Sequence, residues 1–195
     1  MAILRAAYLG DPDLPGNGNV LLITYNKALS GYIRSISDKR LINVTVEHYH
    51  LFARGYLSFR KLIAYNDIIK NNERRQLIKV AVDEVKNTYK PHPFFKRSIG
   101  FFESEVGWIA KNGIDNLDTY LEVERIGRGD GLVGHFRKIV WAIRTSYLKQ
   151  RSDRGFRYDW DDISSTVLEA LAADASARKY RHIVMMRDRT SRRRC

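Results

Sequence analysis

A short apolar run that leads directly into a helical pattern constrains this chain more than any other stretch. Residues 19–36 read NVLLITYNKALSGYIRSI, and the apolar run Val20–Ile23 follows the turn-forming residues PGNGN. A run of this length with β-branched residues is typical of a strand buried in a parallel sheet. From Ala28 to Ile36 the apolar residues recur at helical spacing. The sequence therefore predicts a buried strand joined to a helix by a polar corner.

This polar corner is a candidate ligand site. In open α/β sheets, ligands bind beyond the carboxyl ends of the strands. The hydrogen-bonding side chains of Thr24 and Asn26 lie here, together with the aromatic ring of Tyr25 and the cation of Lys27. The alternative is an ordinary strand-to-helix corner with a solvated lysine.

A second strand–helix unit follows the first. Ile42–Val46 is another short β-branched run, the helical pattern of His48–Tyr56 comes after it, and Tyr180–Met186 is a third candidate strand. Successive strand–helix units favour a parallel α/β sheet. We therefore expect an α/β fold whose sheet residues lie in 1–57 and 155–186.

The middle of the chain, residues 58–154, shows helical patterns and no convincing strand, which predicts a large all-helical insertion. Its aromatic residues are expected to form a core, with a binding surface as the alternative: Phe94, Phe95, Phe101, Phe102 and Trp108. Three cations, Lys96, Arg97 and Lys111, would line a DNA track or a solvated face. Beyond the insertion, Asp159, Asp161 and Asp162 are expected in the first turn of a helix, where carboxylates are favoured; a magnesium cluster is the alternative.

The charge favours a polyanionic partner. The 195 residues carry a formal net charge of +12, which points to nucleic acid first and a membrane surface second. Residues 187–195, RDRTSRRRC, hold five arginines and one aspartate, and we expect them to be a disordered basic tail. The single cysteine, the absence of a signal peptide and the lack of a long apolar run favour a cytoplasmic protein without a membrane partner.

Several segments, taken in order, resemble superfamily-one helicases of the UvrD/Rep type. AILRAAYL resembles the helix after the family's phosphate-binding loop, and VLLITYNKAL resembles motif Ia. VTVEHYHLFAR resembles motif Ib, with Tyr49 and His50 matching its aromatic residue and histidine, and His48 in place of the more usual threonine. The helical insertion is similar to the 1B subdomain, through FFESEVGWIAKNGI and YLEVERIGRG, and YDWDDI resembles the segment before motif II.

The resemblance implies an incomplete RecA-like parallel sheet with a 1B-like insertion, and a single-stranded or forked DNA partner. It implies contacts with the strand from residues 24–27, base stacking by Tyr49 and a phosphate contact by His50. The alternative for Tyr49 is a helix start that packs into the core. His48 and His50 would suggest a metal site, but the sequence offers no evident third ligand.

The chain departs from the family at both nucleotide motifs. ATP and Mg²⁺ are the cofactors of the intact family, but the sequence has no G-x-x-x-x-G-K-[ST] loop, and Gly127–Gly134 lacks the lysine and follows a helix. Where the family has an Asp-Glu pair, this chain has Met186 and Arg187, with Asp188 displaced. Codons compatible with residues 185–191 encode Asp-Glu-Gly-Gln-Asp-Leu in another reading frame, so we hypothesise a frameshift from about Met185. The DNA sequence tests this hypothesis.

The sequence thus predicts a fragment of an ATP-dependent DNA helicase that keeps single-strand contacts and has no catalytic residues of its own. We expect no ATP hydrolysis from the chain alone. The alternative is a non-catalytic basic DNA-binding or regulatory protein that reuses the fold.

Overall fold

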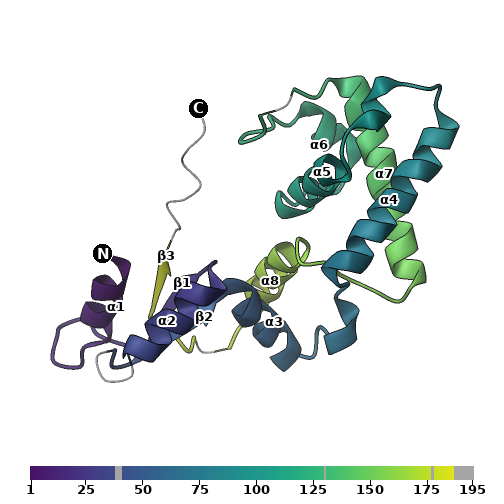
Figure 1. Cartoon of the computed structure of the whole chain (residues 1–195). Helices are drawn as coiled ribbons and strands as arrows, with labels where there is room; N and C mark the ends of the chain where they lie inside the picture. The colour runs from purple at the N-terminus through teal and green to yellow at the C-terminus, as the bar shows by residue number, and fades with distance from the viewer. Residues whose placement is uncertain (38–40, 130, 177, 187–195) are drawn as a thin grey trace. The chain divides into compact units, whose positions relative to one another are not determined.

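The computed structural model describes residues 1–37, 41–129, 131–176 and 178–186. The chain divides into two compact units (Figure 1). The α/β unit comprises Met1–Phe59 and the described residues from Ala172 onward, and the helical unit comprises Arg60–Leu171. The predicted basic tail, including Arg187 and Asp188, lies outside the described residues.

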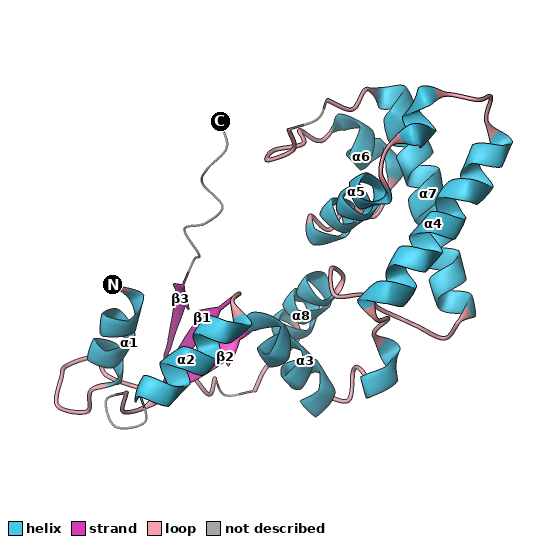
Figure 2. Cartoon of the chain, viewed as in Figure 1, coloured by secondary structure: helices cyan, strands magenta, loops and turns pink. Residues whose placement is uncertain are grey.

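The α/β unit is built on a parallel sheet of three strands, so the predicted mixed α/β class with a parallel sheet is confirmed (Figure 2). The strand order is β2-β1-β3, with β1 in the centre. The elements of this unit, in chain order, are α1 (Ala2–Gly10), β1 (Val20–Thr24), α2 (Lys27–Ser37), β2 (Val44–His48), α3 (Tyr49–Phe59) and β3 (His182–Met186).

The central strand β1 is buried along its whole length, as its continuous apolar run predicts. Val20 and Leu22 pack with Val46 of β2 and Val184 of β3. Ala6 of α1 and Ile33 of α2 complete this core. Because Thr24 is in register with both His48 and Met186, the carboxyl ends of the three strands are level.

Strand β2 begins two residues later than the sequence predicts. Asn43 has a φ of 57°, in the left-handed region that asparagine tolerates better than β-branched residues do. Its carbonyl oxygen accepts a hydrogen bond from the Val20 backbone N–H (2.8 Å), and its side chain donates to the Gly10 carbonyl (3.1 Å). This turn holds residues 42–43 out of the strand and aligns β2 with β1.

The helical unit contains the expected helices and an aromatic core. Its elements are η1 (Tyr65–Asp67), α4 (Asn71–Thr88), η2 (Pro93–Lys96), α5 (Ile99–Lys111), α6 (Leu117–Glu122), α7 (Gly134–Asp153) and α8 (Ile163–Ala172). Phe94 and Phe102 are buried in its core, and Phe95, Phe101 and Trp108 pack against it. The prediction that these aromatic residues form a core is confirmed.

Residues 155–171 belong to the helical unit, whereas their sequence pattern predicts that they belong with the sheet. Backbone hydrogen bonds explain the difference. Ile69 N–H donates to the Tyr158 carbonyl (2.9 Å), and Tyr158 N–H donates to the Asp67 carbonyl (2.9 Å). The segment before α4 and the segment after α7 are therefore paired with each other within the helical unit.

Within the described ranges, no helix is long and apolar enough to cross a membrane.

Candidate nucleic-acid interface

The corner between β1 and α2 is shaped by two of the predicted site residues. Thr24 Oγ1 accepts a hydrogen bond from the Asn26 backbone N–H (3.2 Å), and Asn26 Oδ1 accepts one from the Leu29 backbone N–H (3.1 Å). Asn26 is thereby the N-cap of α2. Thr24 is only 1% exposed, so its side chain holds the turn and does not lie on the surface.

Aromatic rings from two segments meet at this corner. The ring centroids of Tyr25 and Tyr49 lie 4.9 Å apart, and the His50 ring lies 5.5 Å from Tyr49 and 6.4 Å from Tyr25. Tyr25 is 53% exposed, whereas Tyr49 and His50 are half-buried. The structure thus joins the two predicted motifs into one group, which we call the aromatic corner: Tyr25, His48, Tyr49 and His50.

His48 is the residue of this group whose role the sequence did not indicate. Its Nε2 lies 3.0 Å from the carbonyl oxygen of Tyr25, so the ring donates to the corner of the neighbouring strand. Its ring centroid lies 5.4 Å from that of His50. The parallel register places His48 beside Thr24, and only knowledge of that register could have identified this contact.

A cation and a helix N-terminus lie next to the aromatic corner. Lys27 is the first residue of α2 and is exposed. The free backbone N–H groups of a helix start favour anions such as phosphate. Arg34, on the same helix, is bonded to Glu47 (2.7 Å) and to the Val46 carbonyl (2.8 Å). The corner can therefore offer a ring face to a base and positive charge to a phosphate.

The residues present do not fit a nucleotide and its magnesium ion. The sequence has no G-x-x-x-x-G-K-[ST] loop, and β3 ends on the apolar side chain of Met186, the first of the two positions at which the resemblance implies a carboxylate. The second position, Arg187, lies outside the described residues. In the part of the chain that the structure describes, no group of three or more His, Cys, Asp or Glu side chains is placed to hold a metal ion. Neither the His48–His50 pair nor the aspartates before α8 are part of such a group.

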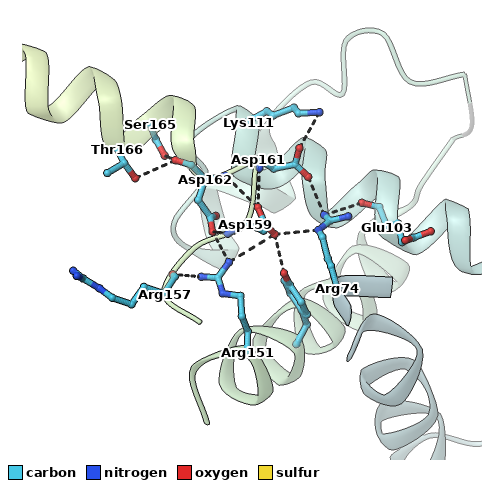
Figure 3. A network of polar contacts seen from close by, with 11 residues as sticks. Arg74, Glu103, Lys111, Arg151, Arg157, Asp159, Asp161, Asp162, Ser165 and Thr166 are labelled. Atoms are coloured by element: carbon cyan, nitrogen blue, oxygen red, sulfur yellow. Dashed lines mark hydrogen bonds and ion pairs between the residues drawn. The ribbon is translucent and has the colours of Figure 1, made fainter. Parts of the chain in front are cut away.

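Those aspartates form an ion-pair network inside the helical unit (Figure 3). Asp159, 2% exposed at its side chain, accepts hydrogen bonds from Arg74 Nε (3.1 Å) and the Tyr147 hydroxyl (2.8 Å). Asp161 pairs with Arg74 (2.9 Å) and with Lys111 (3.0 Å). Helix α8 begins only at Ile163, so the expectation of an acidic first turn is corrected. The carboxylates precede the helix and form ion pairs with arginine and lysine side chains.

The network sets the ionisation of its carboxyl groups. Burial alone would raise the pKa of Asp159, but the Arg74 guanidinium, the Tyr147 hydroxyl and Arg151 hold that pKa below its ordinary value. Burial and the neighbouring Asp159 charge raise the pKa of Asp162, even though Arg151 contacts it. The network therefore has a structural role, joining α4, α5 and α7 to the segment before α8.

A second buried carboxylate fixes the loop after α6. Glu105 accepts hydrogen bonds from the Tyr120 hydroxyl (2.8 Å) and from Arg125 Nη2 (2.7 Å), and it pairs with Arg128 (2.8 Å). Burial would raise the pKa of Glu105, but Arg125, Tyr120 and Arg128 together lower it. The carboxylates of Asp159 and Glu105 are thus occupied by contacts inside the helical unit. The aromatic corner therefore stays the candidate site.

No family model matches the chain, and no curated protein matches it either.

Proposed function

We propose that the aromatic corner binds single-stranded DNA without sequence preference, as part of a UvrD/Rep-like helicase. The observation that supports this most directly is the exposed Tyr25 ring, held 4.9 Å from Tyr49 and next to Lys27 at the start of α2. Every base has a face that stacks on an aromatic ring, so such a site tolerates any sequence.

The residues of the aromatic corner and those beside it have different roles in the proposed binding. Tyr25 and Tyr49 offer the stacking surface, and Lys27 and His50 face the phosphates. Thr24 and Asn26 act indirectly, because their side-chain oxygens hold the turn and cap the helix. The net charge of +12 adds a salt-dependent attraction that carries no sequence information.

The chain on its own is proposed to lack ATP hydrolysis. Phosphoryl transfer needs a group that cradles the phosphates and a carboxylate that holds magnesium. The 195 residues contain no G-x-x-x-x-G-K-[ST] loop, and Met186 and Arg187 stand where the resemblance implies the Asp-Glu pair. A DNA-stimulated ATPase activity in the purified protein would contradict this part of the proposal.

The binding proposal is tested with a fluorescently labelled oligo-dT strand and fluorescence anisotropy. Replacing Tyr25 with alanine removes a stacking face worth about 1–3 kcal/mol, so affinity should fall roughly 5- to 150-fold. Tyr32→Ala is the matched control, because Tyr32 is also exposed (62%) but lies on α2, outside the aromatic corner. Equal binding by the Tyr25→Ala variant and the wild type would refute the stacking role.

The charge contribution is tested by the dependence of affinity on salt. Lys27→Ala should weaken binding and reduce the slope of log affinity against log salt by about 0.7, the value for one contact with a single strand. Lys79→Ala, at an exposed position on α4, should leave the slope unchanged. An unchanged slope in the Lys27→Ala variant would remove Lys27 from the site.

The second candidate is a non-catalytic, basic DNA-binding or regulatory protein that reuses the fold. A variant truncated after Met186 separates this candidate from a non-functional remnant. Salt-sensitive binding that survives truncation and falls with Lys27→Ala favours the regulatory protein. If truncation abolishes binding, the arginines of residues 187–194 caused it, and the aromatic corner is not a DNA site.

A further inference from the structure

The aromatic corner contains two histidines whose charge the proposed DNA ligand would affect. Histidine is the side chain that ordinarily changes charge between pH 5 and 8. Of the five histidines in the chain, His48 and His50 lie together, with ring centroids 5.4 Å apart. This arrangement concentrates two titratable rings where a phosphate backbone is proposed to pass.

The hydrogen bonding of His48 fixes where its next proton would bind. A carbonyl oxygen only accepts hydrogen bonds, so Nε2, 3.0 Å from the Tyr25 carbonyl, carries the hydrogen of the neutral ring. Nδ1 is buried and has no hydrogen-bond partner among the described residues. A second proton would therefore bind at Nδ1, and both ring nitrogens would then be donors.

Within the part of the chain that the structure describes, the strands and helices next to His48 carry few carboxylates. The only carboxylate of β1, β2, α2 and α3 within the described residues is Glu47, which pairs with Arg34 and, as the neighbour of His48 in the strand, points to the opposite face. Asp174, which follows α8, accepts a hydrogen bond from the Tyr56 hydroxyl of α3 (2.8 Å). The other titratable or charged side chains of these elements and their corner are Tyr25, Lys27, Tyr32, Arg34, Tyr49, His50, Arg54 and Tyr56. A polyanion in the corner would add negative charge beside the His48 ring.

We propose that His48, together with His50, makes single-strand binding at the aromatic corner proton-dependent, so that affinity rises as pH falls from 8 to 5.5. This inference rests on the proposed DNA-binding function. Coupling between two ligands is reciprocal: if bound phosphates favour a proton on the imidazole, that proton favours the phosphates equally. The ring also keeps its bond to the Tyr25 carbonyl in both charge states, so the corner retains its shape.

The test compares the affinity for oligo-dT at pH 8 and pH 5.5, because thymine has no group that titrates in this interval. The wild type should bind roughly fivefold more tightly or better at pH 5.5, the lower range of coupling between two bound ligands. His48→Gln, which keeps an N–H donor for the Tyr25 carbonyl but does not titrate, should lose most of this response. His50→Gln should lose part of it.

His182 gives the matched control. It also places Nε2 near a backbone carbonyl, that of Gly16 (2.9 Å), but it is the first residue of β3 and lies at the amino ends of the strands. His182→Gln should keep the full pH response. The inference is overturned if His48→Gln responds to pH as the wild type does, or if His182→Gln loses the response equally.

Calorimetry on the unaltered protein provides a measurement that does not depend on the folding of a variant. Binding of oligo-dT at pH 6.5, in buffers with different ionisation enthalpies, should show net uptake of protons; zero uptake overturns the inference. DNA binding that depends on Tyr25 but not on pH contradicts the proton coupling alone. Absence of binding at either pH contradicts the proposed function, and the proton coupling with it.

Discussion

Replacing Asp159 with asparagine should destabilise the helical unit strongly. The substitution preserves the shape of the side chain but removes the charge that faces Arg74, whose side chain is 13% exposed. At an effective dielectric constant of about 20, two unit charges about 4 Å apart interact by roughly 4 kcal/mol. Loss of one partner from a buried pair costs about 3–5 kcal/mol, and because Asp161 and Asp162 still face the arginines, we expect about 3 kcal/mol.

Urea denaturation monitored by tryptophan fluorescence measures this loss. The three tryptophans, Trp108, Trp141 and Trp160, all lie in the helical unit, so the signal reports on that unit alone. With an m value of about 1–3 kcal/mol/M, a loss of about 3 kcal/mol lowers the urea midpoint by about 1–3 M.

Glu103→Gln is the matched control for Asp159→Asn. Glu103 pairs with Arg75, whose side chain is 60% exposed, and exposed pairs contribute about 1 kcal/mol or less. If both variants shift the midpoint equally, the buried charge of Asp159 does not stabilise the helical unit more than an exposed ion pair does.

Two further predictions concern the same unit. Because the pKa values of Asp159 and Glu105 are lowered in the folded state, their contribution to stability is present above the unfolded values of about 4 and is lost as pH falls through the folded values. The raised pKa of Asp162 acts in the opposite direction and offsets part of this loss. The urea midpoint should therefore be lower at pH 3 than at pH 7, and an equal or higher midpoint at pH 3 would contradict the assignment. Gly107→Ala would bring a Cβ to 2.4 Å from Asp161 Oδ2, which Arg74 and Lys111 hold in place, so we expect a loss of about 1–3 kcal/mol in thermal or urea unfolding. Gly100→Ala, on the same helix with its nearest neighbouring atom at 3.8 Å, should be neutral or stabilising, and similar losses in both variants would disprove the steric argument.

The candidate site was only partly predictable. The sequence indicated Tyr25 and Lys27 through their position after a buried strand, and Tyr49 and His50 through the resemblance to motif Ib. It did not indicate that Thr24 is buried or that Asn26 caps α2, because both residue types serve equally well as ligands and as turn formers. The bond from His48 to the Tyr25 carbonyl depends on strand register, which neither segment specifies alone.

By itself, the sequence determined the local structure: a change in apolar spacing from a continuous run to a helical repeat marks where β1 ends and α2 begins, because that spacing decides which backbone conformation buries the side chains. The tertiary structure alone decided which distant residues meet. Arg74 and Asp159 are 85 positions apart, and their ion pair explains why the aspartate lies before α8, where it faces a basic side chain, and not in the first turn of that helix. The aromatic corner likewise exists only once β1 and β2 are aligned, since a contact between separate segments depends on the packing of the whole unit and not on the pattern within either one.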